Sequence, residues 1–325
     1  MLSNREQERH SLRVIHRLAL GRARRRYLTV GTMALVCACQ RGDLIGTIVD
    51  SGSTAQVDGA VDAGLPVMRF GPPRLIPGLS ASFAGDDEDP TFTGDLLELY
   101  FMSTRNGTQD IWLSQRASSA AAWGPPSLVA ELSSPAQEYA PGVSLDGLNI
   151  WFGTDRNPAL GGIWRSSRAT RADPWSAPSP VAELATGQID SSPAVDATET
   201  LMVFASIRPG SAGIDIYSTS RVSPSAAWGP ARPVAGANSP ADDFSPFVAQ
   251  GGLVIFFAST RGGNADLFYS ARHSTDEPFP FPVPLVDLNS PAYEADPTLS
   301  PDLTYMVFTS SRTGSRALYE AHALR

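Results

Sequence analysis

Five acidic residues recur at one fixed place in the sequence, each standing three residues before a proline. They are Asp87, Glu138, Asp190, Asp243 and Glu294. Carboxylates gathered around one point can hold a cation, and two of them in unlike surroundings can act as acid and base on a glycosidic bond. Each can instead accept backbone hydrogen bonds or pair with an arginine that recurs at the same interval, because buried charges are normally paired.

The structural interpretation is favoured, since five equivalent acids do not supply the unlike environments that separate an acid from a base. We still take this acidic ring as the candidate binding site and assign no catalytic residue, metal ligand or cofactor. The acidic runs 85–89 and 241–243 offer oxygen ligands for calcium, but solvated acidic turns are the simpler interpretation.

Several other kinds of catalytic or metal site require residue types that this sequence lacks or contains too rarely. All 25 basic residues are arginine, which removes lysine Schiff bases and P-loop lysines. After residue 40 there is no cysteine, and the histidines there are His273 and His322, far apart in the sequence. A cysteine or histidine metal cluster and a Ser-His-Asp triad are therefore not expected.

The elements that position the acids repeat with a period near fifty. Arginines recur at intervals of 51, 52, 53 and 51 residues, each following an apolar run and preceding a turn and a second apolar run. They are Arg105, Arg156, Arg208, Arg261 and Arg312. Short strands at this period, without helical spacing, indicate blades of a β-propeller. Each unit predicts a first strand after the proline, then two apolar strands, then a fourth.

The fourth strand predicts the blade count. Segments of the type "WGPPSLVAEL" (from Trp123) follow the first four units, but none follows the fifth. The matching segment, "FGPPRLIPGL", starts at Phe70, ahead of the first unit. We predict an all-β, five-bladed β-propeller of four-stranded antiparallel blades over residues 67–325, closed by the N-terminal strand completing the last blade.

These repeats resemble the WD40-like (PD40) unit of TolB and of the prolyl oligopeptidase propellers. That unit runs P-x-x-S-P-D-G, an apolar strand, S-x-R-x-G, an aspartate and an aromatic strand. Residues 296–314, "DPTLSPDLTYMVFTSSRTG", are similar to it, and Asp110, Asp215 and Asp266 match its aspartate. The resemblance covers about residues 67–325 and implies a propeller that binds other molecules.

The first 66 residues predict export. An arginine-rich stretch precedes the apolar residues 27–38, which are too few to span a bilayer but suit a signal segment. "LVCAC" resembles a lipobox, with Cys39 as the residue that takes the lipid; an ordinary cleaved signal is the alternative. We expect an export signal at 1–39, a flexible linker at 40–66, and a cell-envelope location, outer membrane or periplasm, or secretion.

Charge and architecture together give two functional hypotheses. Residues 1–38 carry +6, so the formal charge of −8 for the whole chain leaves −14 on the remainder, which disfavours nucleic acid. The first hypothesis is a monomeric, non-catalytic module that binds a protein or an envelope polymer through one propeller face and meets the membrane only through its lipid. The alternative is a carbohydrate-binding or glycoside-hydrolase-like propeller that uses the axial carboxylates, as five-bladed furanosidases do.

Overall fold

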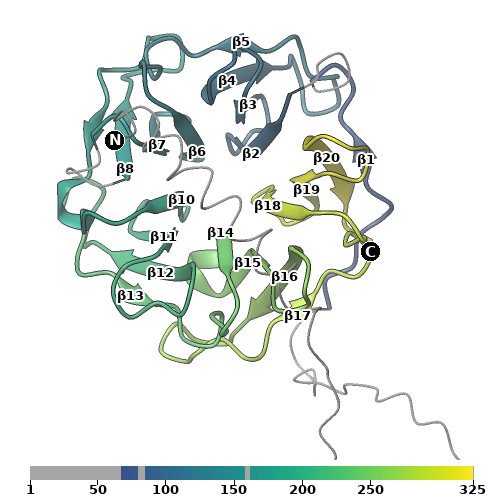
Figure 1. The fold of residues 1–325 in the computed structure, drawn as a ribbon. Coiled ribbons are helices and arrows are strands. Elements are labelled where there is room, and N and C mark those ends of the chain that lie inside the picture. Colours follow the sequence, from purple (N-terminus) through teal and green to yellow (C-terminus); the bar gives the residue numbers. More distant parts are fainter. Residues whose placement is uncertain (1–66, 80–84, 158–161, 325) are drawn as a thin grey trace, which may run out of the picture. The chain divides into compact units, whose positions relative to one another are not determined.

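A computed structural model describes residues 67–79, 85–157 and 162–324. The chain divides into two units, 1–64 and 65–325, and the described residues belong to the second. They form five four-stranded antiparallel sheets arranged around a central axis, a five-bladed β-propeller (Figure 1). The fold predicted from the repeat is confirmed.

Each blade has the same strand order from the axis outward (Figure 1). The innermost strands are β2 (Asp87–Phe92), β6 (Glu138–Val143), β10 (Asp190–Val195), β14 (Asp243–Ala249) and β18 (Glu294–Leu299). The second strands are β3 (Glu98–Ser103), β7 (Asn149–Thr154), β11 (Leu201–Ser206), β15 (Val254–Ser259) and β19 (Tyr305–Ser310). The third strands are β4 (Asp110–Gln115), β8 (Ile163–Ser167), β12 (Asp215–Ser220), β16 (Asp266–Ala271) and β20 (Ala317–His322). The outermost strands are β5 (Ser127–Leu128), β9 (Ser179–Pro180), β13 (Arg232–Pro233), β17 (Val283–Pro284) and β1 (Arg74–Leu75). In the described part of the chain, the short 3-10 helices η2 (Ala182–Leu184) and η3 (Gln250–Gly252) lie in connections.

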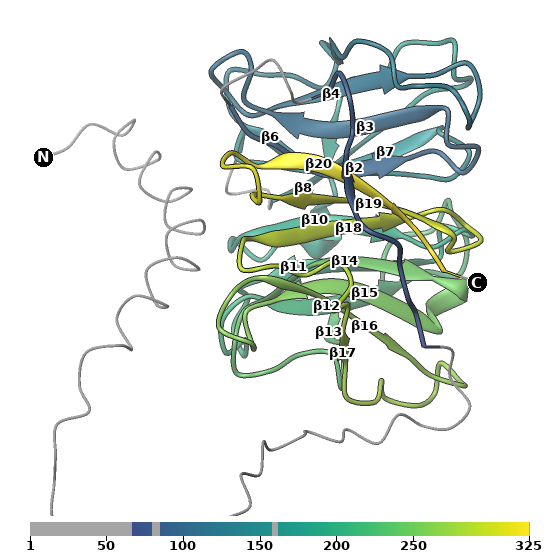
Figure 2. The same cartoon turned by 90° about the vertical axis from the view of Figure 1, so that its right-hand side faces the viewer.

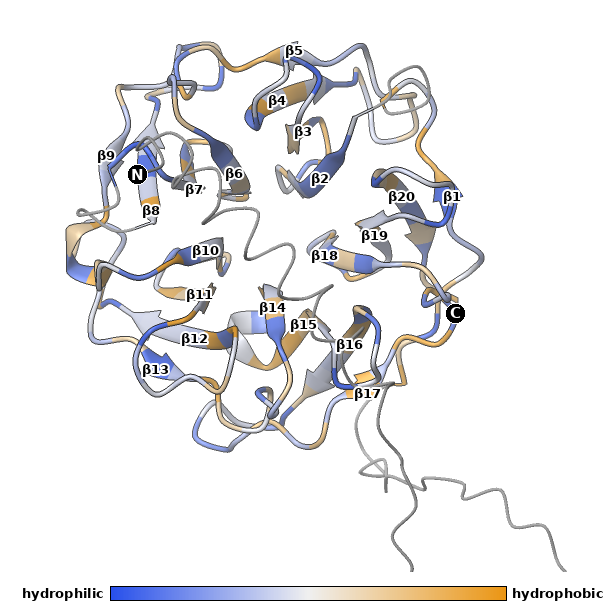
Figure 3. Ribbon diagram, in the orientation of Figure 1, coloured by the Kyte–Doolittle hydropathy of each residue, from blue (hydrophilic) through white to orange (hydrophobic). Residues whose placement is uncertain are grey.

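Packing between blades explains the long apolar runs. Every residue of β3, β15 and β19 is buried, because neighbouring blades cover both faces of each inner sheet. The innermost strand β2 is more polar, with the sequence DEDPTF, and is drawn largely as hydrophilic in Figure 3. The blades are therefore held by their apolar second and third strands, while polar residues are left for the axis.

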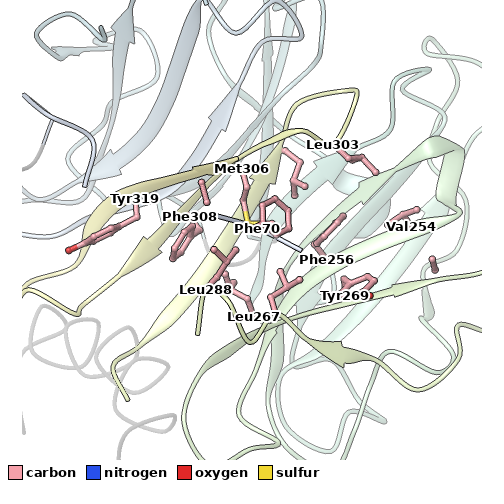
Figure 4. Packing of buried hydrophobic residues seen from close by; sticks show 14 of the residues in the cluster. Phe70, Val254, Phe256, Leu267, Tyr269, Leu288, Leu303, Met306, Phe308 and Tyr319 are labelled. Atoms are coloured by element: carbon pink, nitrogen blue, oxygen red, sulfur yellow. The ribbon is translucent and has the colours of Figure 1, made fainter. Parts of the chain in front are cut away.

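The N-terminal strand closes the ring as predicted. β1 pairs antiparallel with β20, placing Leu75 opposite Tyr319, and Phe70 forms a further bridge with Ala323. Figure 2 shows these first described residues running beside the last blade. Phe70 packs in a cluster shared by the fourth and fifth blades, against residues such as Phe256 and Met306 (Figure 4). Closure thus adds a buried aromatic side chain to the paired strand edge.

The innermost strands differ from the sequence expectation at their starts. Each was predicted to follow its proline, but each begins three residues earlier, at the repeated acid, and contains the proline. A register shift in each strand spans the proline, as between Tyr139 and Gly142 in β6. Proline has no N–H to donate, so a bulge that leaves its position unpaired lets the strand continue.

The predicted export signal, lipobox, Cys39 and linker lie outside the described residues. Within the described part of the chain, no helix has the length and apolar character needed to span a bilayer.

Candidate functional site

The five sequence-predicted acids occupy equivalent positions at the starts of the innermost strands. Each is almost fully buried and forms an ion pair with the repeat arginine of its own blade. The pairs are Asp87–Arg105 (2.8 Å), Glu138–Arg156 (2.9 Å), Asp190–Arg208 (2.8 Å), Asp243–Arg261 (2.6 Å) and Glu294–Arg312 (3.1 Å). The structure shows the arginine pairing that formed the structural alternative; a binding role for these acids stays a prediction.

Each arginine is fixed by more than its acid, as the second blade illustrates. The Arg156 guanidinium donates to the Leu132 carbonyl at 2.5 Å and lies over the rings of Phe152 and Trp164. Burial raises the pKa of Glu138, and the Arg156 charge opposes that effect. The pair with its aromatic neighbours is therefore a clamp that ties the innermost strand to the second and third strands of its own blade.

The acidic runs were expected to be solvated turns, but the later residues of each run belong to a strand. Asp87 and Glu88 are buried and open β2, and Asp243 is buried and opens β14. Strand pairing takes these residues into the sheet because the strand starts at the acid, ahead of the proline.

A cavity on the propeller axis is lined by all five innermost strands. It measures about 40 Å³, room for a few water molecules. The lining begins at the residue immediately before each repeat proline. These residues are Asp89, Ala140, Ser192, Ser245 and Asp296.

These five residues share a backbone conformation that explains their position. Their φ angles are 55°, 50°, 52°, 50° and 57°, in the left-handed region that residues other than glycine seldom adopt. The bulge imposes this conformation and turns the backbone at that point. As a result, the axis is lined from two residues beyond the acids that the sequence singled out.

Two of the axial residues are carboxylates in contact with each other. The Asp89 N–H donates to Asp296 Oδ2 at 3.3 Å. Ser245 Oγ donates to Asp296 Oδ1 at 2.5 Å, and the Ala140 N–H donates to Asp89 Oδ2 at 3.1 Å. Burial, followed by the charge of Asp296, raises the pKa of Asp89 well above its ordinary value. The first and last blades therefore meet at a pair of carboxyl groups that do not favour two negative charges.

A row of four side chains crosses three blades at the end of the axis where the innermost strands begin. The Phe244 and Tyr293 rings stack at 6.4 Å, and Arg316 lies 4.2 Å over the Tyr293 ring. Arg316 Nη1 contacts Glu88 Oε2 at 2.7 Å. Burial raises the pKa of Glu88 to about 8, although the Arg316 charge lowers it. We call this side of the propeller, with the turns between second and third strands, the entrance face.

The sequence analysis did not single out Asp89 and Asp296, because it searched for acids that recur in every unit. The position before the proline varies between units, from aspartate to alanine to serine. A residue type that recurs in every blade stabilises the blade itself. A position whose residue type varies between blades can make one side of the axis chemically different from another. That variation was visible in the sequence, but its place on the axis was not.

Comparisons with known proteins identify the fold. No family model matches the chain, and no curated protein sequence matches it. Among solved structures, TolB from Acinetobacter baumannii is similar, with a TM-score of 0.50 and 15% identity over 74% of this chain and 55% of TolB. The chain thus spans about half of that structure's length.

Two glycoside-degrading enzymes are also similar in fold. An α-L-arabinofuranosidase from Podospora anserina has a TM-score of 0.53 and 10% identity over 79% of this chain and 96% of its own. An endo-arabinase from Bacteroides thetaiotaomicron has a TM-score of 0.53 and 13% identity over 73% and 94%. At these identities the likeness shows a shared β-propeller fold.

Proposed function

We propose that this chain is an exported, lipid-anchored β-propeller of the bacterial cell envelope that binds a protein or an envelope polymer through its entrance face. The repeat is inferred to be the WD40-like (PD40) unit found in TolB, and Cys39 is inferred to take the lipid. One observation carries the binding role: all five repeated acids are already paired with the arginine of their own blade. That pairing supports an acidic ring that holds the blades in shape and leaves recognition to surface residues.

The entrance face is the proposed contact surface because its side chains differ from blade to blade. Phe244, Tyr293 and Arg316 are half-buried and stack on one another, and aromatic and arginine side chains are the types that dominate binding interfaces. The turn after each repeat arginine also differs in length and composition between blades. Loops that vary on a regular scaffold can give a propeller a specific partner.

The test compares variants on opposite faces of the full chain. Phe244→Ala removes a ring of the entrance row, whereas Val222→Ser alters a residue that is 95% exposed after β12, on the opposite face. Partners are captured by crosslinking from envelope extracts and then measured with purified partner. We expect at least tenfold weaker binding for Phe244→Ala and unchanged binding for Val222→Ser. Equal binding by both variants would contradict the proposed face. The lipid anchor is tested separately with Cys39→Ser, which is expected to lose membrane attachment.

A carbohydrate-active propeller is the second candidate, favoured by the carboxyl pair in the axial cavity. Glycosidases use two carboxyl groups about 5–5.5 Å or about 6.5–9.5 Å apart. In this chain the Asp89 N–H donates to Asp296 Oδ2 at 3.3 Å, so the two residues adjoin on the axis. The test is hydrolysis and binding of arabinan and arabinofuranosides by the wild type and Asp89→Asn. Sugar turnover that the variant loses while keeping its melting temperature would overturn the non-catalytic proposal.

A further inference from the structure

Two carboxylates lie at the junction between the third and fourth blades, on the entrance face. Asp215 opens β12, and Asp242 stands immediately before β14 in the neighbouring blade (Figure 1). Asp242 Oδ1 accepts the Ile214 N–H at 3.0 Å, which places its carboxylate beside the start of β12. The repeat arginines of both blades are already paired with the repeated acids, and no ion pair within the described residues involves Asp215 or Asp242. The negative charge of this junction is therefore not neutralised by the chain itself.

The equivalent junction between the fifth and first blades shows what is different here. Arg316 stands where the third blade has Ile214, and its N–H donates to Asp86 Oδ1 at 3.0 Å, the same contact that Ile214 makes with Asp242. The Arg316 guanidinium contacts Glu88 Oε2 at 2.7 Å. The junction of the third and fourth blades thus repeats the backbone contact but lacks the positive side chain.

An oxygen of Asp215 gives a second observation at the same place. Asp215 is 7% exposed, and its Oδ1 has no hydrogen-bond partner among the described residues, whereas Oδ2 accepts the Ala212 N–H at 3.1 Å. Burial raises the pKa of Asp215, and the charges of Asp243 and Asp242 raise it further, so its side chain faces those two carboxylates. A buried carboxylate oxygen without a donor costs free energy that a positively charged donor would recover.

The geometry of the junction favours an organic cation over a metal ion. In the part of the chain that the structure describes, no three acidic, histidine or cysteine side chains come together in a way that could hold a metal. A guanidinium is broader than a metal ion and donates in a fixed planar fork, so it can reach two carboxylates on separate strands. Each repeat arginine of this propeller already combines a carboxylate contact with aromatic rings, as Arg261 does with Asp243, Phe257 and Phe268.

We propose that the junction between the third and fourth blades binds an arginine side chain of the partner, with Asp242 and Asp215 as the carboxylate acceptors. This inference rests on the proposed binding role of the entrance face and specifies the partner as a protein that exposes an arginine. The guanidinium would first meet Asp242, which is half-buried, and would then supply the donor that Asp215 Oδ1 lacks. It would take the place that the Arg316 side chain fills in the fifth blade.

The test is calorimetric titration of the full chain with a synthetic peptide of alternating glycine and arginine. The matched probe carries citrulline, the uncharged analogue, in place of every arginine. We expect saturable binding of the arginine peptide that weakens as NaCl is added, because salt screens the attraction, and no binding of the citrulline peptide. Equal binding of the two peptides, or binding of neither, would overturn the proposal.

Variants assign the site. Asp242→Asn and Asp215→Asn keep the side-chain size, and each is expected to weaken binding of the arginine peptide by about tenfold or more. Ile214→Arg places a guanidinium where the fifth blade has one and is expected to abolish binding. Asp276→Asn, at an exposed acid on the opposite face, is the matched control and keeps wild-type affinity. If Asp215→Asn does not fold, the other two variants decide; wild-type affinity in either of them overturns the proposal.

The results separate this inference from the proposed function. Absence of peptide binding, while Phe244→Ala still loses the captured partner, overturns the arginine site and leaves the entrance face as the contact surface. Peptide binding with the expected variant pattern, while Phe244→Ala keeps the captured partner, supports the arginine site and contradicts the proposed function.

Discussion

Leu75 lies opposite Tyr319 in the fifth sheet, so a residue near the start of the propeller completes the blade formed by its end. The next residue, Ile76, is fully buried, and its N–H donates to the Leu318 carbonyl at 3.0 Å. The closing segment is therefore part of the core as well as of the sheet edge.

Truncating the side chain of Ile76 should weaken the closure of the ring and lower the stability of the propeller. Ile76→Ala leaves a cavity between the first and last blades, and such changes cost about 2–5 kcal/mol. Chemical denaturation of the variant should show a loss of unfolding free energy in this range. Leu324→Ala, at a side chain that is 58% exposed, should change little and serves as the control. A loss for Ile76→Ala no larger than for the control would show that the closure does not stabilise the propeller.

Removing an arginine of a clamp should cost more than removing a surface arginine. In Arg156→Ala the buried Glu138 loses its cationic partner and keeps the hydrogen bonds from Ser134 and Thr154, a change that costs about 3–5 kcal/mol. Arg232→Ala in the exposed strand β13 should stay within about 0.5 kcal/mol. In a double-mutant cycle, Glu138→Ala with Arg156→Ala should lose less than the sum of the single changes. Additive losses would contradict the clamp.

A side chain at Gly142 should push two blades apart. A Cβ atom there would lie 1.9 Å from the Pro193 carbonyl oxygen of the next innermost strand, and the backbone must move to make room. We expect Gly142→Ala to lower the unfolding free energy by about 1–3 kcal/mol or more. At Gly71 the corresponding Cβ would meet its nearest atom at 3.6 Å, so Gly71→Ala should be nearly neutral. Similar melting temperatures for the two variants would disprove the close approach of the strands.

Two buried tyrosines should titrate only when the propeller unfolds. Burial raises the pKa of Tyr100 and of Tyr305 above the ordinary value of about 10, and each hydroxyl donates to a carboxylate, Glu98 Oε2 or Glu320 Oε2. A raised pKa in the folded state gives stability that is complete below pH 10 and is lost as the pH rises toward the folded value.

The measurement is tyrosinate absorbance against pH, followed together with circular dichroism. Tyr100→Phe and Tyr305→Phe should reduce the part of the absorbance that appears only with unfolding. Tyrosinate formation by these residues in a propeller that is still folded would contradict their burial.

The sequence by itself determined the number of blades and the way the ring closes. The five arginines that recur from Arg105 to Arg312 give the number of units. The likeness of the Phe70 segment to the Trp123 segment assigns the missing fourth strand to the last blade. Both are properties of repetition, which is visible in one dimension because every blade must bury the same apolar faces.

Only the tertiary structure decided which acids lie on the axis. In a regular strand, alternation predicts the side on which each residue lies, but a bulge adds a residue and shifts the register. The bulge at each proline places Asp89 and Asp296 on the axis. Asp87 and Glu294 stay in the clamps with their arginines. The contact between Asp89 and Asp296 further requires the first and last blades to be neighbours, which is a consequence of closure in space. Asp89 and Asp296 are far apart in the chain, but they become neighbours because the ring brings the first and last blades together. No local pattern of the sequence shows that these two residues are close in space.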